Sequence, residues 1–327
     1  MDYRTVGRTG IQVSNLCFGA MSFGANADEE TSKTMYKRCR EAGINFFDTA
    51  DVYSGGRSEE ILGECIAHER DSIVLTTKVF WPTGADVNAR GLSRRHIIQG
   101  VEASLRRLKT DYIDFYFVHD FDKSTPMEET LRALDDLQRQ GKILHPAVSN
   151  WAAWQITKGL GVSAREQLAR FELIQPMYNL VKRQAEVEIL PMAKSEQIGV
   201  ITYSPLGAGL LTGKYGVNKR PEKGRLVDEA RYGDRYGSNE DFVAAEQFTK
   251  YAQEHDMNPA TLAVAWVKAN PAVTAPIIGA RNLDQLEDSL AAANFKMSPE
   301  MYSEISRLSR TPAPATDRTE VLTGKWS

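Results

Sequence analysis

Residues 44–53 read INFFDTADVY, and this stretch contains the pattern from which the fold of the whole chain can be worked out. Ile44 to Phe47 have the apolar character of a buried strand, yet the run ends on a carboxylate, Asp48, and a phenol follows at Tyr53. Burying a carboxylate is costly unless a partner compensates it. Asp48 either caps the following turn or belongs to a site at the end of a strand.

The run at 44–50 is one of a series of short apolar runs separated by longer amphipathic segments. Most are continuously apolar instead of alternating, which is typical of strands covered on both faces. The strand candidates are 16–19, 44–50, 73–78, 112–119, 143–150, 171–175, 199–204 and 275–279.

The amphipathic segments between these runs predict helices. Ser93 precedes one of them, and Asn258-Pro259 opens another with proline in its first turn, both of which are helix start signals. The helix candidates are 29–42, 58–69, 94–108, 127–140, 151–158, 183–196, 240–255, 258–269, 282–293 and 299–308.

Eight strand-then-helix units in succession predict an α/β fold, a (β/α)₈ TIM barrel. The opening YRTVGRTGIQVS (3–14) adds a small β-hairpin that closes the barrel floor, and 299–308 adds a C-terminal helix. We find no linker or internal repeat, so residues 1–327 are expected to form a single domain. A long loop, about 207–239, follows the seventh strand, and its polar part, 213–239, either folds over the cofactor or substrate pocket or is a surface excursion.

Composition narrows the class of protein. The 327 residues carry a formal net charge of −3, with 42% hydrophobic and 25% charged residues, which is ordinary for a globular protein and gives no reason to expect nucleic acid or a membrane as partner. No apolar run reaches about eighteen residues, and the N-terminus lacks a signal-peptide core. Cys17, Cys39 and Cys65 form neither a disulfide framework nor a zinc pattern, so we expect a cytoplasmic protein with reduced cysteines.

Four titratable residues fall at or just after strand ends, where barrel enzymes place their active sites. Asp48, Lys78 and His119 end the second, third and fourth strands, and Tyr53 lies in the loop after the second. Each has an alternative interpretation: a turn cap, a loop aromatic, a solvent-facing lysine, a core histidine. Because all four would meet at one rim, a shared site is the better explanation.

Together the four residues have the chemistry of a proton-donating device. The pKa of a free tyrosine is about 10, so its hydroxyl is a weak proton donor at neutral pH. A buried ammonium from Lys78 would stabilise the phenolate of Tyr53 and lower that pKa, and Asp48 would supply the ammonium's counter-charge. His119 would orient the substrate oxygen, which makes a tuned general acid beside a polarised carbonyl.

Several long motifs, in order, resemble the aldo-keto reductase superfamily, in particular its bacterial, NADPH-dependent branch of aryl-alcohol dehydrogenases and channel β subunits. The motifs that carry the resemblance are GINFFDTADVYSGGRSEEILG (43–63), TTKV (76–79), YIDFYFVH (112–119), VSNW (148–151), QPMYNL (175–180), ITYSPLGAGLLTGKY (201–215) and IIGARNLDQLEDSL (277–290).

The resemblance implies catalytic roles for Asp48, Tyr53, Lys78 and His119, and an extended NADP(H) as cofactor without a Rossmann domain. GAGLLTG (207–213) nearly matches G-x-G-x-x-G, but its last spacing is one residue too long, so we interpret it as the loop that approaches the pyrophosphate. The cofactor-binding residues implied are Gly19, Met21, Asp48, Ser149, Asn150, Gln175, Tyr203, Ser204, Pro205, Leu206, Gly207, Leu210, Lys214, Gly279, Arg281, Gln285 and Asp288.

Arg281, at the start of the last barrel helix, resembles the residue that clamps a 2′-phosphate, which favours NADPH over NADH. Its alternative is a solvated helix charge. Aromatic residues past the strand ends predict an apolar substrate wall, with core packing as the alternative for each. The substrate-binding candidates are Phe23, Tyr53, Trp81, His119, Phe121 and Trp151.

Three positions depart from the commoner family pattern. Asp120 stands where many relatives have arginine, and Ser289 stands where asparagine is usual. His145-Pro146 lies in the fifth strand, where proline would remove a ladder hydrogen bond, so we expect that strand to start late or to bulge.

The function predicted from the sequence is reversible, NADPH-dependent reduction of a small aldehyde or ketone, with Tyr53 as general acid. An oligomer is possible. The resemblance also leaves open a non-catalytic NADP(H)-sensing auxiliary subunit, as some members of the superfamily modulate ion channels. A metal-dependent hydrolase built on His119 and Asp48 is disfavoured, because no second histidine ends a strand and no metal site is expected.

Overall fold

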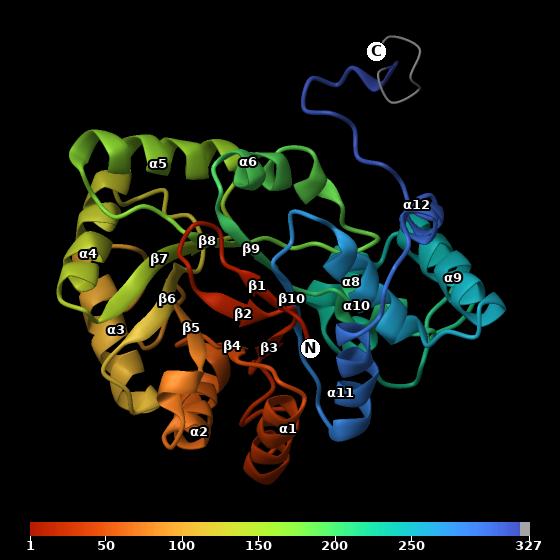
Figure 1. Ribbon diagram of the computed structural model, residues 1–327, viewed down its shortest axis with the longest axis horizontal. Helices are drawn as coiled ribbons and strands as arrows, with labels where there is room; N and C mark the ends of the chain where they lie inside the picture. Colours follow the sequence, from red (N-terminus) through yellow and green to blue (C-terminus); the bar gives the residue numbers. More distant parts are fainter. Residues whose placement is uncertain (321–327) are drawn as a thin grey trace.

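The computed structural model describes residues 1–320, which form a closed barrel of parallel strands ringed by helices (Figure 1). The barrel closes because the last strand pairs with both the first barrel strand and the strand before it. The predicted (β/α)₈ TIM barrel is therefore confirmed. Its strands, in chain order and in spatial order, are β3 (Cys17–Gly19), β4 (Phe46–Asp48), β5 (Val74–Val79), β6 (Ile113–Val118), β7 (Ile143–Ser149), β8 (Leu173–Gln175), β9 (Gly199–Thr202) and β10 (Ala275–Ile278).

The helices lie outside the strands and cover the barrel on all sides (Figure 1). Those of the barrel units are α1 (Glu29–Glu41), α2 (Arg57–Ile66), α3 (Arg94–Leu108), α4 (Met127–Arg139), α5 (Ala153–Glu166), α6 (Ile189–Ser195), α10 (Pro259–Ala269) and α11 (Leu283–Leu290). Those added to this plan are α7 (Arg225–Asp228), α8 (Ala230–Tyr236), α9 (Asn239–Glu254) and α12 (Pro299–Ser306).

The helix starts follow from side chains that satisfy free backbone N–H groups. Asp28 accepts from the backbone of Thr31 at the start of α1, and Ser93 caps α3 as its position predicts. Asn258 accepts from the second and third residues after it, with Pro259 in the first turn of α10. The first residues of these helices are therefore determined by local side-chain caps.

The hydrophobic core has two parts. Inside the barrel, side chains from alternating strand positions fill the lumen, among them Phe46, Phe115 and Phe117. Between the strands and the helices lies a larger cluster that includes Phe47, whose ring packs 4.9 Å from that of Tyr36 on α1. Phe46 and Phe47 thus point to opposite sides of β4, which is why this run is continuously apolar.

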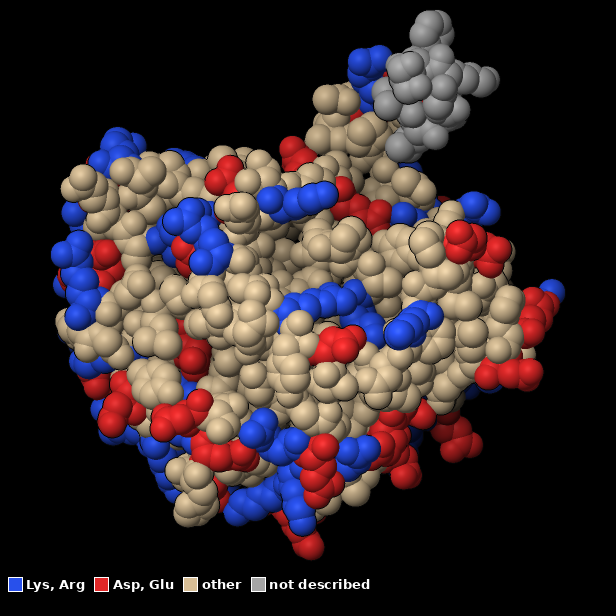
Figure 2. Space-filling model, in the orientation of Figure 1, with Lys and Arg blue, Asp and Glu red and all other residues tan. Residues whose placement is uncertain are grey.

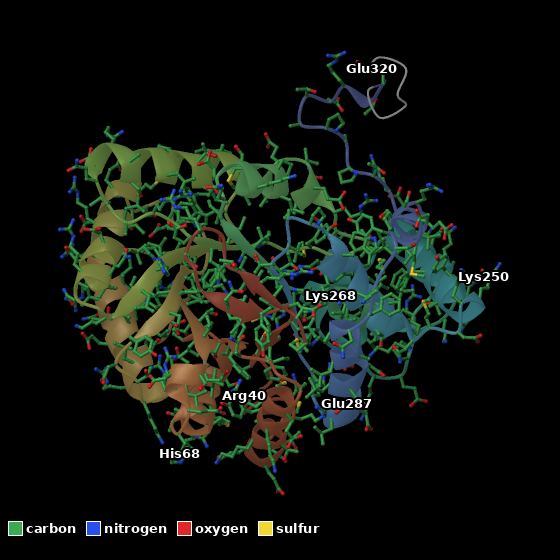
Figure 3. All side chains as sticks on the ribbon, in the orientation of Figure 1. Arg40, His68, Lys250, Lys268, Glu287 and Glu320 are labelled. Atoms are coloured by element: carbon green, nitrogen blue, oxygen red, sulfur yellow. The ribbon has the colours of Figure 1, made fainter. Side chains whose placement is uncertain are left out.

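The N-terminal hairpin closes the bottom of the barrel, as expected. Strands β1 (Tyr3–Thr5) and β2 (Gln12–Ser14) are antiparallel, and the hairpin lies across the end of the barrel that faces the viewer in Figure 1. Arg4 donates to the carbonyl of Val273 at 2.7 Å, and the neighbouring buried Lys268 donates to the carbonyls of Ala293 and Phe295 (Figure 3). These bonds satisfy carbonyls in the segments that follow α10 and α11.

The prediction that the fifth barrel strand starts late or bulges at Pro146 is wrong. Strand β7 runs from Ile143 to Ser149 and pairs with β6 in unbroken register, Pro146 opposite Tyr116. The carbonyl of Pro146 accepts from Glu172, one residue before β8 begins, and the first β7–β8 pair starts at the next residue, Ala147. Proline therefore stands where no ladder partner needs its missing N–H.

The polar stretch after β9 is folded, with two short helices that the sequence did not predict. Gly207–Thr212 forms a 3₁₀ turn, and α7 and α8 follow. Tyr232 and Tyr236 of α8 are buried, and the amide of Asn179 donates to the hydroxyl of Tyr236 at 3.2 Å. The stretch is therefore packed on the barrel and is not a surface excursion.

The outer surface is mixed in charge. In Figure 2, basic and acidic side chains are interspersed over the face around the hairpin, without a broad area of one sign. Pairs between helices contribute: Arg38 of α1 binds Glu287 of α11, which Figure 3 labels. The predicted C-terminal helix α12 stacks Tyr302 on Trp266 of α10, with ring centroids 5.4 Å apart. No helix within residues 1–320 has the length and hydropathy to span a bilayer.

Candidate active site

Asp48 and Lys78 form a buried ion pair at the carboxyl ends of β4 and β5. The Lys78 ammonium donates to both carboxylate oxygens of Asp48 at 2.7 Å and to the carbonyl of Thr49 at 2.7 Å. Lys78 has no exposed surface, so the alternative that it reaches solvent is excluded. All three ammonium protons have acceptors, which a buried lysine requires.

Two further side chains hold the Asp48 carboxylate in place. The hydroxyl of Thr76 donates to Oδ1 at 2.7 Å, and the amide of Gln175 donates to the same oxygen at 2.9 Å. Thr76 was not among the residues predicted from the sequence. Strand alternation gives the signal that could have found it, because Thr76 and Lys78 are two residues apart on β5 and face the same side. Asp48 is held here as a partner of Lys78, not as a turn cap.

The electrostatics of Lys78 follow from this pairing. Burial lowers the pKa of Lys78, but the Asp48 carboxylate and then Tyr53 outweigh burial and hold the pKa above its ordinary value. The ammonium is therefore charged at neutral pH. Its nitrogen lies 5.1 Å from the centroid of the Tyr53 ring.

The expected lowering of the Tyr53 pKa is wrong as a net effect. Burial raises the pKa of the Tyr53 phenol above its ordinary value, and the Lys78 ammonium opposes that rise without reversing it. Tyr232 of α8 adds a smaller upward contribution to this pKa. The phenol is thus protonated at neutral pH, and the nearby ammonium stabilises the phenolate left after a proton is given up.

His119 follows the end of β6 and faces Tyr53, with ring centroids 5.9 Å apart in an edge-on arrangement. Burial, and then the Lys78 ammonium, hold the pKa of His119 well below its ordinary value, so the imidazole is neutral at neutral pH. Its Nδ1 is buried and has no hydrogen-bond partner among the described residues. The structure therefore brings all four predicted catalytic residues together at one rim.

The loop between β4 and α2 gives Tyr53 its position. Ser54 and Gly55 adopt left-handed backbone angles, and the hydroxyl of Ser54 donates to the carbonyl of Phe23 at 2.8 Å. Gly56 has φ +96°, and a Cβ there would lie 2.9 Å from Cδ of Arg107. A side chain at residue 56 would strain the backbone and clash with α3, so glycine is required at this turn.

Asn150 connects three barrel strands on the opposite side of the rim. It follows β7 with φ +60°, its amide donates to the carbonyl of His119 at 2.9 Å, and its Oδ1 accepts from the Tyr203 hydroxyl at 2.8 Å. Ser149 donates to the carbonyl of Gln175 at 3.0 Å. These predicted cofactor residues therefore lie together, beside the catalytic rim.

A cluster of cations lies around the 3₁₀ turn after β9. Burial, then Arg281, then Arg225 lower the pKa of Lys214, so three positive side chains are close to one another. A Cβ on Gly209 would lie 3.3 Å from Cε of Lys214, so the lysine rests against this turn. None of the three cations forms an ion pair with a carboxylate among residues 1–320. Arg225, which the sequence analysis missed, comes from α7.

This cation cluster fits the phosphates of a dinucleotide, because three positive charges converge and the one carboxylate acting on Lys214, Asp228, only partly offsets them. The remaining predicted cofactor residues take several positions. Leu210 is fully buried and packs in the core, Asp288 accepts from Asn258, and Gln285 accepts from the backbone of Arg281. Those at turns or strand ends around the rim are Gly19, Met21, Ser204, Pro205, Leu206, Gly207 and Gly279.

The aromatic wall holds only some of the expected residues. Phe121 packs edge-on against Trp151 at 5.0 Å and lies 6.3 Å from Trp154, which is 62% exposed and was not predicted. Trp81 is 42% exposed, whereas Trp151 is only 4% exposed and packs in the core against Phe121 and Phe171. Phe23 has no exposed surface and packs 5.6 Å from Phe18, so it lies in the core beneath the rim and not in the wall.

The other two departures are also accounted for. Asp120 is half-buried, and one of its oxygens accepts from the backbone of Phe121. Ser289 is buried on α11, with its hydroxyl 3.5 Å from the carbonyl of Gln285. As for metals, residues 1–320 contain no group of three or more His, Cys, Asp or Glu side chains arranged to hold an ion. His145 stacks on Phe115 inside the barrel, away from His119.

Comparison with known proteins identifies one matching family and several similar proteins. Residues 15–310 match a family described as the Aldo/keto reductase family. A probable voltage-gated potassium channel subunit beta from Arabidopsis thaliana is 38% identical over 90% of this chain and 92% of the relative. A rice protein of the same description is 36% identical over 97% of this chain and 99% of the relative, and an uncharacterized oxidoreductase, YrpG, of Bacillus subtilis is 34% identical over 97% and 98%.

Proposed function

The chain belongs to the aldo/keto reductase family, and on that premise we propose that it catalyses the reversible, NADPH-dependent reduction of aldehydes and ketones to alcohols. Family membership makes it an oxidoreductase that uses a nicotinamide cofactor. The observation that carries the finer proposal is the Asp48–Lys78 ion pair behind the Tyr53 phenol, with a neutral His119 facing that phenol.

In this proposal Tyr53 donates a proton to the oxygen of the substrate carbonyl. When bound, the reduced nicotinamide supplies the hydride. The Lys78 ammonium stabilises the phenolate that remains on Tyr53, and Asp48, fixed by Thr76 and Gln175, keeps Lys78 charged. His119, being neutral, offers an N–H to the carbonyl oxygen and orients it without competing for the proton.

Lys214, Arg225 and Arg281 would hold the phosphates of the cofactor, and their shared charge favours NADPH over NADH. Asn150 and Tyr203 would bind the nicotinamide end, because they are joined to each other and to the backbone of His119. Removing the guanidinium in Arg281→Ala should then weaken NADPH binding much more than NADH binding, measured by fluorescence titration. Equal loss for both would remove the 2′-phosphate role.

The substrate in this proposal is an aryl or medium-chain aliphatic carbonyl. Phe121, Trp154 and Trp81 present aromatic surface beside the rim, with the buried Trp151 packed against Phe121, and apolar walls with few polar groups favour such ligands. Tyr53 and His119 would contact the carbonyl itself.

The experiment that tests the proposal is a panel of aromatic, short aliphatic and charged carbonyls, assayed by loss of NADPH absorbance with NADH run alongside. Turnover of uncharged aryl and aliphatic aldehydes with NADPH, and weaker turnover with NADH, would support it. A purified protein that binds NADPH but turns over none of the panel above the rate of a Tyr53→Phe control would overturn it.

A second candidate is an NADP(H)-binding auxiliary subunit of an ion channel. The names of the relatives favour it, since the plant proteins are described as channel beta subunits. The two candidates share the same site and differ in rate. A sensor would bind NADP(H) tightly and oxidise it far more slowly than about 1 s⁻¹, which is the lower end of typical enzyme turnover. A single-turnover measurement therefore separates the two candidates.

A further inference from the structure

Behind the catalytic rim, between β4–β5 and helices α2 and α3, lies a second buried acidic cluster to which the proposed reaction assigns no role. Its centre is Asp51, which is 3% exposed and stands in the loop between Asp48 and Tyr53. Both carboxyl oxygens of Asp51 are buried and accept no hydrogen bond from a side chain among residues 1–320; the backbone N–H of the next residue, Val52, is close enough to lower the Asp51 pKa in part. A buried carboxylate in this position would be costly.

Every element packed around Asp51 contributes a charged or titratable group. Glu59 comes from α2, Arg107 from α3, Lys78 from β5 and Tyr116 from β6. Arg107 is already engaged: it binds Oε2 of Glu59 at 2.6 Å, while Thr77 donates to Oε1. Lys78 is engaged by Asp48. Both cations therefore act on Asp51 only from a distance, and neither forms an ion pair with it among the described residues.

The side chains around Asp51 are closely packed by α2 and α3. The hydroxyl of Tyr116 is fully buried and has no hydrogen-bond partner in the described part of the chain. A Cβ on Gly100 would lie 3.1 Å from that hydroxyl, and a Cβ on Gly63 would lie 2.6 Å from the Arg107 carbonyl. Glycine at these two positions lets α2 and α3 close over the cluster, so water cannot compensate a charge there freely.

We propose that the neutral carboxyl of Asp51 is a positioning group for Tyr53: it packs the loop Asp48–Gly56 under α2 and α3, and its ionisation loosens this loop and limits carbonyl reduction on the alkaline side. The backbone supports such coupling. The N–H of Asp51 donates to the carbonyl of Lys78 at 3.2 Å, and the N–H of Tyr53 donates to that of Ala50. A shift of Asp51 therefore moves the backbone that carries the phenol.

The electrostatics agree with this geometry. Burial, and then Glu59, raise the pKa of Asp51 to about 8. An unfolded aspartate has a pKa of about 3.9, so between about pH 4 and about pH 8 the folded protein binds more protons at this site than the unfolded chain does. The contribution of Asp51 to stability therefore falls as pH rises through that window and is level above it. Tyr53 and Lys78, whose pKa values are raised, do not titrate there.

The test compares the parent protein, Asp51→Asn, which keeps the shape of the neutral acid, and Asp111→Asn, which removes an exposed carboxyl as control. We expect the kcat/KM of the parent for an aldehyde to fall above about pH 8, and that limb to move up by about one unit or more in Asp51→Asn only. The urea midpoint of the parent should fall relative to Asp51→Asn from about pH 5 to about pH 8, and the control should follow the parent.

An alkaline limb shared by the parent and Asp51→Asn, or no limb near this pH, would overturn the inference. Should Asp51→Asn fail to fold, infrared spectroscopy of the parent decides: the band of a protonated carboxyl must disappear between about pH 7 and about pH 9. A spectrum without that change contradicts the inference. The inference rests on the proposed function only for the kinetic readout. Absence of carbonyl reduction at every pH would contradict the proposed function, and the stability and infrared measurements would still test the role of Asp51.

Discussion

The two sides of the loop between β4 and α2 bury carboxylates three residues apart in opposite ways. On the inner side, Asp48 is 3% exposed and receives a full ammonium, a hydroxyl and an amide. On the outer side, Asp51 is equally buried, but the cation within reach is bound to Glu59. The comparison shows that a buried carboxyl group is either paired with a cation or protonated. In this loop the paired group, Asp48, supports the chemistry, and the protonated group, Asp51, supports the position of the loop.

Replacing Lys78 with methionine should have the largest effect, because it removes the cation on the inner side. We expect turnover of a test aldehyde to fall by about 10²–10⁴-fold. Breaking a buried pair leaves Asp48 uncompensated, so the free energy of unfolding should fall by about 3–5 kcal/mol, measured by urea titration. Lys268→Met is the matched control: it removes a buried lysine on the far side of the barrel and should spare turnover per folded molecule. Equal loss of turnover in both variants would contradict the inner-side role.

Replacing Arg107 with methionine breaks the pair on the outer side. Arg107 is partly exposed, so the expected loss in unfolding free energy is smaller, about 2–3 kcal/mol, and turnover at neutral pH should fall by less than about tenfold. Because Arg107 opposes the rise in the Asp51 pKa, its removal should also move the alkaline limb of kcat/KM to higher pH. A loss of turnover as large as that of Lys78→Met would erase the distinction between the two sides.

The threonines of β5 sharpen the comparison one hydroxyl at a time. Thr76 donates to Asp48 on the inner side, and its neighbour Thr77 donates to Glu59 on the outer side. Each change to valine removes one hydrogen bond to a carboxylate and should cost about 1.5–3 kcal/mol of unfolding free energy. Only Thr76→Val should also lower kcat, by about tenfold or less. Stopped-flow kinetics on both variants checks this, and a kcat loss confined to Thr77→Val would reverse the assignment.

The smallest expected effect is on the acid side of the pH profile. Burial, and then Lys78, hold the pKa of His119 well below its ordinary value, so its imidazole is neutral and kcat/KM should be level from about pH 6 to about pH 8. The unfolded chain binds a proton at this histidine below about pH 6.5 and the folded protein does not, so stability should fall as pH drops below that value. An acid limb with a midpoint near about 6.5 that vanishes in His119→Gln would contradict a neutral His119.

Much of this arrangement could be predicted from the sequence because its signals are local. Continuous apolar runs such as 44–47 mark strands covered on both faces, and a start signal such as Ser93 marks a helix. Once these units make a barrel, the rule that strand ends share one rim brings Asp48, Lys78 and His119 together without further information. The N-terminal hairpin was predicted from equally local signals, two β-prone pieces around Gly7 and Gly10.

What the sequence did not predict depends on distances between elements. The direction of the Tyr53 pKa depends on how deeply the phenol is buried, and a sequence pattern does not contain that depth. Phe23 looked like a rim aromatic by position, yet packing on Phe18 takes it into the core. Asp51 was not singled out from the sequence, because only the assembled helices show that Arg107 is bound to Glu59. Pro146 looked disruptive until the start of β8 fixed which side its nitrogen faces.

The measurement that tests the central claim most directly is single-turnover oxidation of bound NADPH by an aldehyde, in the parent and in Tyr53→Phe. The account predicts that the variant binds NADPH as tightly as the parent and that its hydride-transfer rate falls by about 10²-fold or more. Reduction at the parent rate, with NADPH affinity unchanged, would show that the Tyr53 hydroxyl gives no proton to the substrate and would contradict the role assigned to the Asp48–Lys78 pair.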